Sequence, residues 1–204
     1  MQPNVKVRKT KQILRRLQSL ADPKVVEQMA RFGIDSGNLL GISMPNLRKI
    51  AKEAGKDHAV ALELWQTGIH EAQMVAALVD EPALVSEAQM EQWAAKFDSW
   101  GICDGVCGTL FDKTPFAYEK AAEWSTREAE YVKRAGFALM ACLAVHDKRS
   151  GDEAFLRFLP LIEKESIDDR NFVKKAANWA LRQIGKRNLA LNKKAIASAE
   201  SISH

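Results

Sequence analysis

Apolar residues recur every three or four positions along most of the chain, which is the spacing of amphipathic helices. Capping residues and prolines mark many helix starts, and Gly55, Gly68 and Gly185 fall where helices are expected to end. No stretch alternates apolar and polar residues for long enough to predict a strand. The pattern predicts helices over residues 4–20, 23–32, 44–54, 57–67, 70–79, 86–97, 100–112, 116–124, 128–146, 152–164, 169–186 and 189–202.

One short sequence recurs along the chain. Val132-Lys133-Arg134-Ala135 returns 41 residues later as Val173-Lys174-Lys175-Ala176, with one predicted helix between the two copies. Helix pairs that repeat at about 40 residues are typical of HEAT-type arrays. Because no linker or low-complexity segment interrupts the pattern, we predict one domain over residues 1–204. Its fold class is all-α, a HEAT-like helical-repeat array that forms an α-α superhelix.

Composition narrows the class of protein. The chain has 204 residues, of which 47% are hydrophobic and 27% charged, as expected of a globular protein with a sizeable core. No apolar run approaches the roughly 18 residues of a membrane span, and the charged N-terminus lacks the apolar stretch of a signal peptide. We expect a cytoplasmic, nucleoid-associated bacterial monomer without cofactors, although the basic, acid-free N-terminus leaves a mitochondrial presequence as an alternative.

The basic residues are concentrated in two segments that contain no acidic residue. Residues 1–20 hold Lys6, Arg8, Lys9, Lys11, Arg15 and Arg16. Residues 170–194 hold Arg170, Lys174, Lys175, Arg182, Lys186, Arg187, Lys193 and Lys194. Since the net charge of the whole chain is only +4, the remainder carries a net charge of −10. Two basic blocks on an acidic body indicate a polyanion-binding surface, which we expect on the concave face; two solvated helix faces are the alternative.

The predicted helix 169–186 places Trp179 away from its apolar face. Lys175, Arg182 and Lys186 share the face opposite the apolar one, and Trp179 falls among them. A tryptophan surrounded by cations suits a ligand with both rings and phosphates. The alternative is a tryptophan covered by a neighbouring helix.

Two further helices carry charged side chains that are candidates for function. In helix 100–112, Trp100 and Asp104 lie one turn apart, so a ring and a carboxylate are neighbours, although Asp104 alone is equally consistent with a solvated helix surface. Helix 128–146 is apolar on all sides, yet Arg134 stands near its start. A buried arginine needs a partner, which is either a carboxylate such as Asp104 in a structural ion pair or a phosphate.

The cysteines offer a weaker signal. Cys103 and Cys107 are four residues apart on one predicted helix, as half of a metal site would be, but the chain has no second pair near them. We therefore predict no metal site and read both cysteines as small apolar residues of a helical core. An odd number of cysteines without a secretion signal indicates reduced thiols.

Taken in order, several segments resemble the AlkD-like DNA alkylation repair enzymes, the HEAT-like-repeat DNA glycosylases. The matching elements are NLLGISMPNLR at 38–48, Trp100 with Asp104, VKRA at 132–135 and KAANWALR at 175–182. Their order and spacing cover nearly the whole chain. The resemblance implies a hydrolase that wraps double-stranded DNA and excises cationic alkylated purines such as 3-methyladenine and 7-methylguanine.

The resemblance also implies roles for individual residues. Asp104 corresponds to the catalytic carboxylate, Arg134 to its supporting arginine, and Trp100 and Trp179 to the rings that contact the damaged nucleotide. An alkylated purine already carries positive charge and leaves without a general acid, so a carboxylate that stabilises the oxocarbenium-like sugar is sufficient. We expect Lys174, Lys175, Arg182, Lys186, Arg15 and Arg16 to contact DNA phosphates.

Two positions depart from the family pattern. Gly101 stands where an aspartate is expected, and Gly105 where a larger polar residue is expected. These glycines keep a second hypothesis open, a HEAT-like protein that binds damaged or branched DNA without excising bases. A protein-binding scaffold is a third hypothesis, which Trp179 among its cations disfavours.

Overall fold

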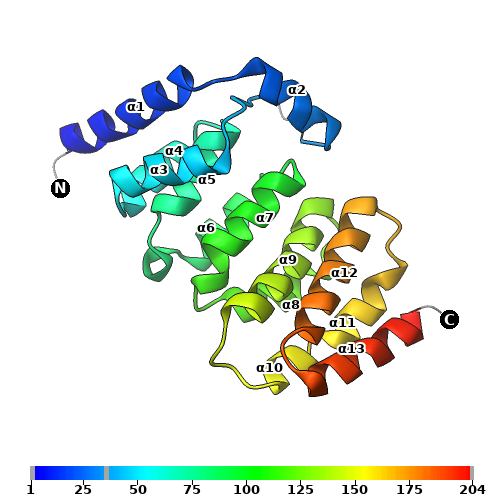
Figure 1. Ribbon diagram of the computed structural model, residues 1–204. Coiled ribbons are helices and arrows are strands. Elements are labelled where there is room, and N and C mark those ends of the chain that lie inside the picture. Colours follow the sequence, from blue (N-terminus) through cyan, green and yellow to red (C-terminus); the bar gives the residue numbers. More distant parts are fainter. Residues whose placement is uncertain (1–2, 35–36, 203–204) are drawn as a thin grey trace. The chain divides into compact units, whose positions relative to one another are not determined.

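The computed structural model describes residues 3–34 and 37–202, and in these ranges it contains helices and 3₁₀ turns but no strand, which confirms the all-α prediction. The chain divides into two compact units, Met1–Ser86 and Glu87–His204. Figure 1 shows the succession of helices along the chain. Among the described residues, none of the helices is both long and apolar enough to cross a membrane.

The first unit is organised around a buried helix. Its helices are α1 (Pro3–Ser19), α2 (Pro23–Arg31), α3 (Met44–Ala54), α4 (His58–Trp65) and α5 (His70–Val79), followed by a 3₁₀ turn at Pro82–Leu84. Only Leu78 in α5 is not buried, and α5 packs against α1, α3 and α4. A helix without a polar face belongs inside its unit, which explains the continuous apolar run of α5.

The segment NLLGISMPNLR begins as a loop held by the start of α5. The Glu71 carboxylate is fully buried and accepts hydrogen bonds from the backbone N–H groups of Leu40 (2.9 Å), Gly41 (2.7 Å) and Ile42 (3.3 Å). Gly41 has φ +74°, and a Cβ there would lie 2.3 Å from the Asp22 carbonyl oxygen. Gly41 therefore meets a steric requirement that no other residue type satisfies.

The second unit is organised around α9. Its helices are α6 (Glu87–Ala94), α7 (Trp100–Thr109), α8 (Ala117–Trp124), α9 (Glu130–His146), α10 (Glu153–Leu156), α11 (Leu159–Lys164), α12 (Asn171–Gly185) and α13 (Leu189–Ile202). Every residue of α9 from Lys133 to Ala144 is buried, because α7, α8 and α12 surround this helix. The prediction that 128–146 is an inner helix is confirmed.

Three helices of the second unit, α7, α9 and α12, run parallel to one another, as can be followed in Figure 1. Side chains near their starts are in contact, since Arg134 of α9 bonds both Asp104 of α7 and the Phe172 carbonyl of α12. The ends of α9 and α12 also correspond, because Arg187, just after α12, donates to the Ala144 carbonyl near the end of α9. Parallel neighbours separated by an intervening helix are expected of stacked helix pairs.

The structure corrects two of the predicted helix ranges. Residues 152–164 form two short helices, α10 and α11, because Pro160 begins a new helix and cannot continue the preceding one. Helix 100–112 ends at Thr109, and a 3₁₀ turn covers Phe111–Lys113. Lys113 donates to the carbonyls of Gly108 and Thr109, which closes the end of α7.

Gly136 of α9 lies directly against the backbone at the end of α8. A Cβ at this position would lie 2.3 Å from the Ser125 backbone nitrogen and 2.8 Å from the Trp124 carbonyl carbon. We expect Gly136→Ala to reduce the free energy of unfolding by about 1–3 kcal/mol, since the helix backbones must separate. Urea denaturation measures this loss. Gly151→Ala is the matched control, because nothing lies within 4 Å of a Cβ there; equal losses in both variants would contradict the expected backbone clash.

Candidate nucleic-acid site on α7, α9 and α12

Asp104 and Arg134 meet across the contact between α7 and α9. Arg134 Nε donates to Asp104 Oδ1 at 2.9 Å, and Arg134 Nη2 donates to Asp104 Oδ2 at 2.7 Å. This is the two-bond geometry in which a guanidinium fixes the plane of a carboxylate. The Asp104 side chain keeps 21% of its surface exposed, whereas Arg134 keeps 7%. The Asp104 carboxylate is therefore partly accessible to solvent, while the Arg134 side chain that holds it is buried.

The remaining guanidinium nitrogen of Arg134 binds a third helix. Arg134 Nη1 donates to the Phe172 carbonyl oxygen at 2.5 Å, in the first turn of α12. Tyr131, one turn before Arg134, packs its ring against the Phe172 ring with centroids 5.9 Å apart. Of the two partners predicted for Arg134, the structure shows the carboxylate. Arg134 thus fixes Asp104 relative to both α9 and α12.

Burial and pairing act on Asp104 in opposite directions. Burial raises the pKa of the Asp104 carboxyl, and the hydrogen bonds and charge of Arg134 offset only part of this rise. For Arg134, burial opposes the charge, but the bonds to Asp104 outweigh it and raise the pKa of the guanidinium. The bonds from Arg134 favour the charged form of Asp104, and a charge in surroundings poor in water has a strong electrostatic effect on a nearby cation.

The two tryptophans of the predicted site are both half-buried. Trp100 begins α7, one turn before Asp104 and on the same side of the helix. Trp179 lies on α12 about 10 Å further along the axis than Phe172, and on the same side of that helix. The sequence left two alternatives for Trp179, an exposed ring among cations or a ring covered by a neighbouring helix. The structure lies between them, because the ring is partly covered.

The basic residues predicted on α12 are exposed. Lys174, Lys175, Arg182 and Lys186 all reach solvent, while Val173, Ala176 and Ala180 are buried on the opposite side. Within the part of the chain that the structure describes, Lys175, Arg182 and Lys186 form no ion pair, and Lys174 lies 3.4 Å from Asp169. The positive charge on this face of α12 therefore remains available to an anion.

The two copies of the recurring basic pair occupy the fourth and fifth positions of α9 and α12. Their environments differ. Lys133 is buried and pairs with Glu165 at 2.7 Å and Asp168 at 3.2 Å, whereas its counterpart Lys174 is exposed. The segment just before α12 supplies the carboxylates that enclose Lys133, whereas the carboxylate near Lys174, that of Asp169, is fully exposed. The repeat thus predicted equivalent positions but not equivalent roles.

In the first unit, Arg15 and Arg16 are both exposed on α1. Arg16 forms an ion pair with Glu53 of α3, which neutralises part of its charge. The guanidinium also lowers the pKa of the Glu53 carboxyl. Contact between these arginines and DNA phosphates stays a prediction, and so does the placement of both basic blocks on one concave face.

The cysteines are core residues of the second unit. Cys103, Cys107 and Cys142 are buried and reduced. Cys103 Sγ donates to the Tyr131 carbonyl at 3.5 Å, and Cys107 Sγ donates to the Ala135 carbonyl at 3.7 Å. Burial, followed by the neighbouring thiols and Asp104, raises the pKa of Cys107 well above its ordinary value. The prediction of small residues in a helical core is confirmed.

Comparison with known proteins agrees with this arrangement. The family model described as DNA alkylation repair enzyme matches residues 13–203. The uncharacterized protein Lin0241 of Listeria innocua is 23% identical over 190 residues, which cover 91% of this chain and 83% of that protein. A solved structure superposes with a TM-score of 0.81 at 20% identity, covering 94% of this chain and 82% of the other. It is described as belonging to "a new family of proteins related to the HEAT-like repeat DNA glycosylases with affinity for branched DNA structures".

The class defined by these findings is that of the HEAT-like helical-repeat proteins. The chain belongs to the DNA alkylation repair enzyme family, whose model spans nearly its whole length. Both the predicted fold and the predicted family are thereby confirmed.

Some contributions to the site left no signal in the sequence. The Phe172 carbonyl is a backbone group that every residue type has, so the sequence does not indicate that it accepts a hydrogen bond from Arg134. The thiol contacts of Cys103 and Cys107 with α9 depend on the distance between two helices, which a single sequence does not specify. The four-residue spacing of Cys103 and Cys107 is visible in the sequence, but it does not show that both thiols contact α9.

Proposed function

We propose that this protein binds double-stranded DNA and hydrolyses the N-glycosidic bond of cationic alkylated purines, of which 3-methyladenine and 7-methylguanine are examples. The observation that carries the proposal is the partly exposed Asp104 carboxylate, which Arg134 holds by two hydrogen bonds one turn from Trp100. A carboxylate fixed in this way can oppose positive charge on a sugar without first having to be oriented.

The chemistry requires little beyond that carboxylate. As the C1′–N bond breaks, its electron pair leaves with the base, which becomes neutral because it already carried a positive charge. The sugar becomes oxocarbenium-like, and the negative charge of Asp104 stabilises it. Water then adds at C1′ and loses a proton to solvent. Trp100 and Trp179 supply the apolar surfaces against which the nucleotide rests.

The direct test is a single-turnover excision assay on duplex DNA that contains 7-methylguanine. Release of the free base with first-order kinetics at saturating enzyme supports the proposal. An otherwise identical duplex with unmodified guanine is the control, since a neutral purine is a much poorer leaving group. Failure to release either base, with duplex binding intact, would contradict the proposed catalysis.

The second candidate function is binding of damaged or branched DNA without excision. Three observations favour it. Gly101 occupies the position of an expected aspartate, and both oxygens of Asp104 are already engaged by Arg134. The solved structure of similar fold is described by its affinity for branched DNA. Competition between a four-way junction and a linear duplex of equal length separates this candidate from the first.

Binding of duplex DNA is expected to be strongly salt-dependent and to show little sequence preference. The exposed cations of α12 and an N-terminal cluster could make about 4–6 phosphate contacts, so the slope of log K against log salt should be roughly −4 to −5. Fluorescence anisotropy over a range of salt concentrations measures this slope. A salt-independent affinity, or no duplex binding at low salt, contradicts the proposed interface.

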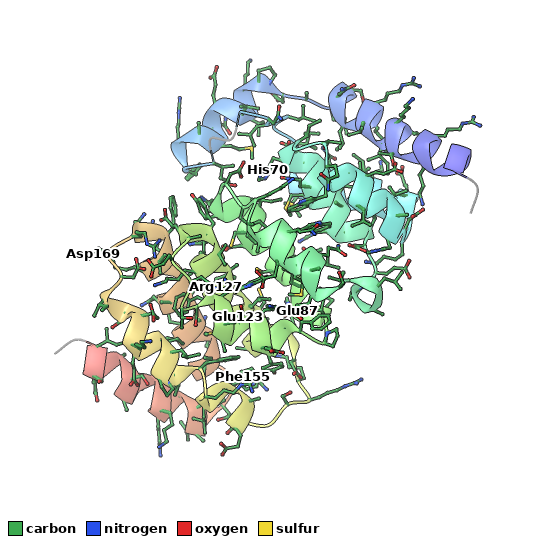
Figure 2. All side chains as sticks on the ribbon, turned by 180° about the vertical axis from the view of Figure 1, so that it is seen from behind. His70, Glu87, Glu123, Arg127, Phe155 and Asp169 are labelled. Carbon is green, nitrogen blue, oxygen red and sulfur yellow. The ribbon has the colours of Figure 1, made fainter. Side chains whose placement is uncertain are left out.

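Variants that each remove one positive charge test which surface of the protein contacts the DNA phosphates. Arg182→Ala should reduce the magnitude of the salt slope by about 1. Arg127→Ala is the matched control, because Arg127 forms an ion pair with Glu123 on α8, and both side chains are labelled in Figure 2. An unchanged slope in Arg182→Ala would exclude Arg182 from the interface.

A further inference from the structure

Helix α7 carries the proposed catalytic carboxylate, and its buried residues are Ile102, Cys103, Val106 and Cys107. Gly101, Gly105 and Gly108 all lie within its ten residues. Each glycine disfavours the helix by roughly 1 kcal/mol relative to alanine and offers no surface for packing. Asp104 nevertheless has to meet Arg134 within the narrow geometry of two parallel hydrogen bonds. Directed contacts between α7 and α9, in addition to the packing of Ile102 and Val106, can therefore set the position of α7.

Two thiols bridge the helices beside the ion pair. On α7, Cys103 and Cys107 stand on either side of Asp104, and both are fully buried. Cys103 donates to the Tyr131 carbonyl at 3.5 Å, and Cys107 donates to the Ala135 carbonyl at 3.7 Å. These two carbonyls stand on either side of Arg134 on α9. The thiol contacts therefore enclose the Asp104–Arg134 pair on both helices.

The physical effect of this pattern is to fix α7 against sliding and rotation. A helical carbonyl that already accepts one N–H retains a second lone pair, which a thiol can use. One such bond is weak, but two that are a helical turn apart select a single register. The seam, by which we mean the contact between α7 and α9, is also closely packed, because a Cβ on Gly108 would lie 3.1 Å from Cys142 Sγ. Small residues and sulfur together allow the close approach that the ion pair needs.

We propose that Cys103 and Cys107 are positioning residues that hold Asp104 in register with Arg134. Their role in catalysis rests on the function proposed above, whereas their role in the ion pair does not. Burial raises the pKa of the Cys107 thiol well above its ordinary value, so this side chain stays a hydrogen-bond donor. Neither sulfur is proposed to contact DNA.

The test measures the ion pair itself. Hydrogen exchange of the Arg134 Nε–H, followed by NMR, reports how often the bond to Asp104 opens. We expect Cys103→Ala and Cys107→Ala each to accelerate this exchange about threefold, and the double variant about tenfold, as weak hydrogen bonds imply. Cys142→Ala is the matched control. It removes a buried sulfur from the same seam, but one that does not bond the carbonyls beside Arg134.

The outcomes separate this inference from the proposed function. Equal acceleration in all three single variants means general loss of packing and overturns the inference, as does no acceleration in any of them. If the pair opens faster only in the Cys103 and Cys107 variants but no protein releases 7-methylguanine, the positioning role stands and the glycosylase proposal fails. If excision occurs, its acid limb should move to higher pH in the double variant, because Arg134 lowers the pKa of Asp104.

Discussion

Replacing Asp104 by asparagine is expected to slow single-turnover excision of 7-methylguanine by about 10²-fold, or about 2.7 kcal/mol of transition-state stabilisation. Asparagine has nearly the shape of aspartate but lacks the negative charge that opposes the oxocarbenium-like sugar. DNA affinity should change little, since the exposed cations of α12 rather than Asp104 attract phosphates. The measurement compares both proteins at saturating enzyme.

The structure adds a consequence for the stability of the Asp104→Asn variant. Arg134 donates to both carboxylate oxygens, so the amide group of asparagine places a donor opposite another donor. We therefore expect a lower Tm, and rates have to be compared well below it. Equal excision rates in the two proteins would remove Asp104 from the mechanism.

Trp179→Ala gives a useful contrast to Asp104→Asn. It removes a contact surface rather than a charge, so it should weaken binding of the damaged duplex as well as excision. If Trp179→Ala lowered only the excision rate at saturation, the half-buried ring would have a role other than the proposed contact. Arg134→Ala is less informative, because it breaks bonds to both Asp104 and Phe172.

Replacing Glu71 by alanine is expected to reduce the free energy of unfolding by about 3–5 kcal/mol. The carboxylate is fully buried and accepts backbone N–H groups of Leu40, Gly41 and Ile42. Alanine leaves these donors without their acceptor, and each buried donor that loses its partner costs about 1–3 kcal/mol. Such a loss is a large part of the stability of a typical domain, 5–15 kcal/mol.

Urea denaturation of the whole chain measures the effect of Glu71→Ala. Glu71→Gln should lie between wild type and Glu71→Ala, because it keeps one acceptor oxygen but sets an amide donor against the backbone. Glu27→Ala on the exposed face of α2 is the control and should change stability by less than about 0.5 kcal/mol. A Glu71→Ala variant as stable as that control would show that the loop does not depend on the carboxylate.

The sequence by itself determined the class of the fold. The spacing of apolar residues is a property of each helix alone, so it placed most of the described helices, including the inner helix α9. The 41-residue recurrence correctly paired α9 with α12. The apolar spacing wrongly predicted one continuous helix over 152–164. The spacing continues across Pro160, where the structure begins a new helix.

The sequence also predicted Asp104 and Arg134 as residues of the candidate site, Asp104 through the family resemblance and Arg134 because an arginine is unusual in a helix that is apolar on all sides. It left the partner of Arg134 open between a carboxylate and a phosphate. Only the tertiary structure decided this, by bringing α7 and α9 close enough for two hydrogen bonds. Contacts between helices depend on how side chains of both interlock, and neither helix encodes that alone.

The same reason explains what the pattern missed. Lys133 and Lys174 have equivalent positions, yet one is buried in an ion pair and the other is exposed, because Glu165 and Asp168, just before α12, contact Lys133. Glu71 looks like an ordinary first-turn glutamate until the loop at Leu40–Ile42 folds onto it. Periodicity fixes which side of a helix is apolar, but the partner of a buried charge is set by a distant segment of the chain, and only the folded protein shows which one.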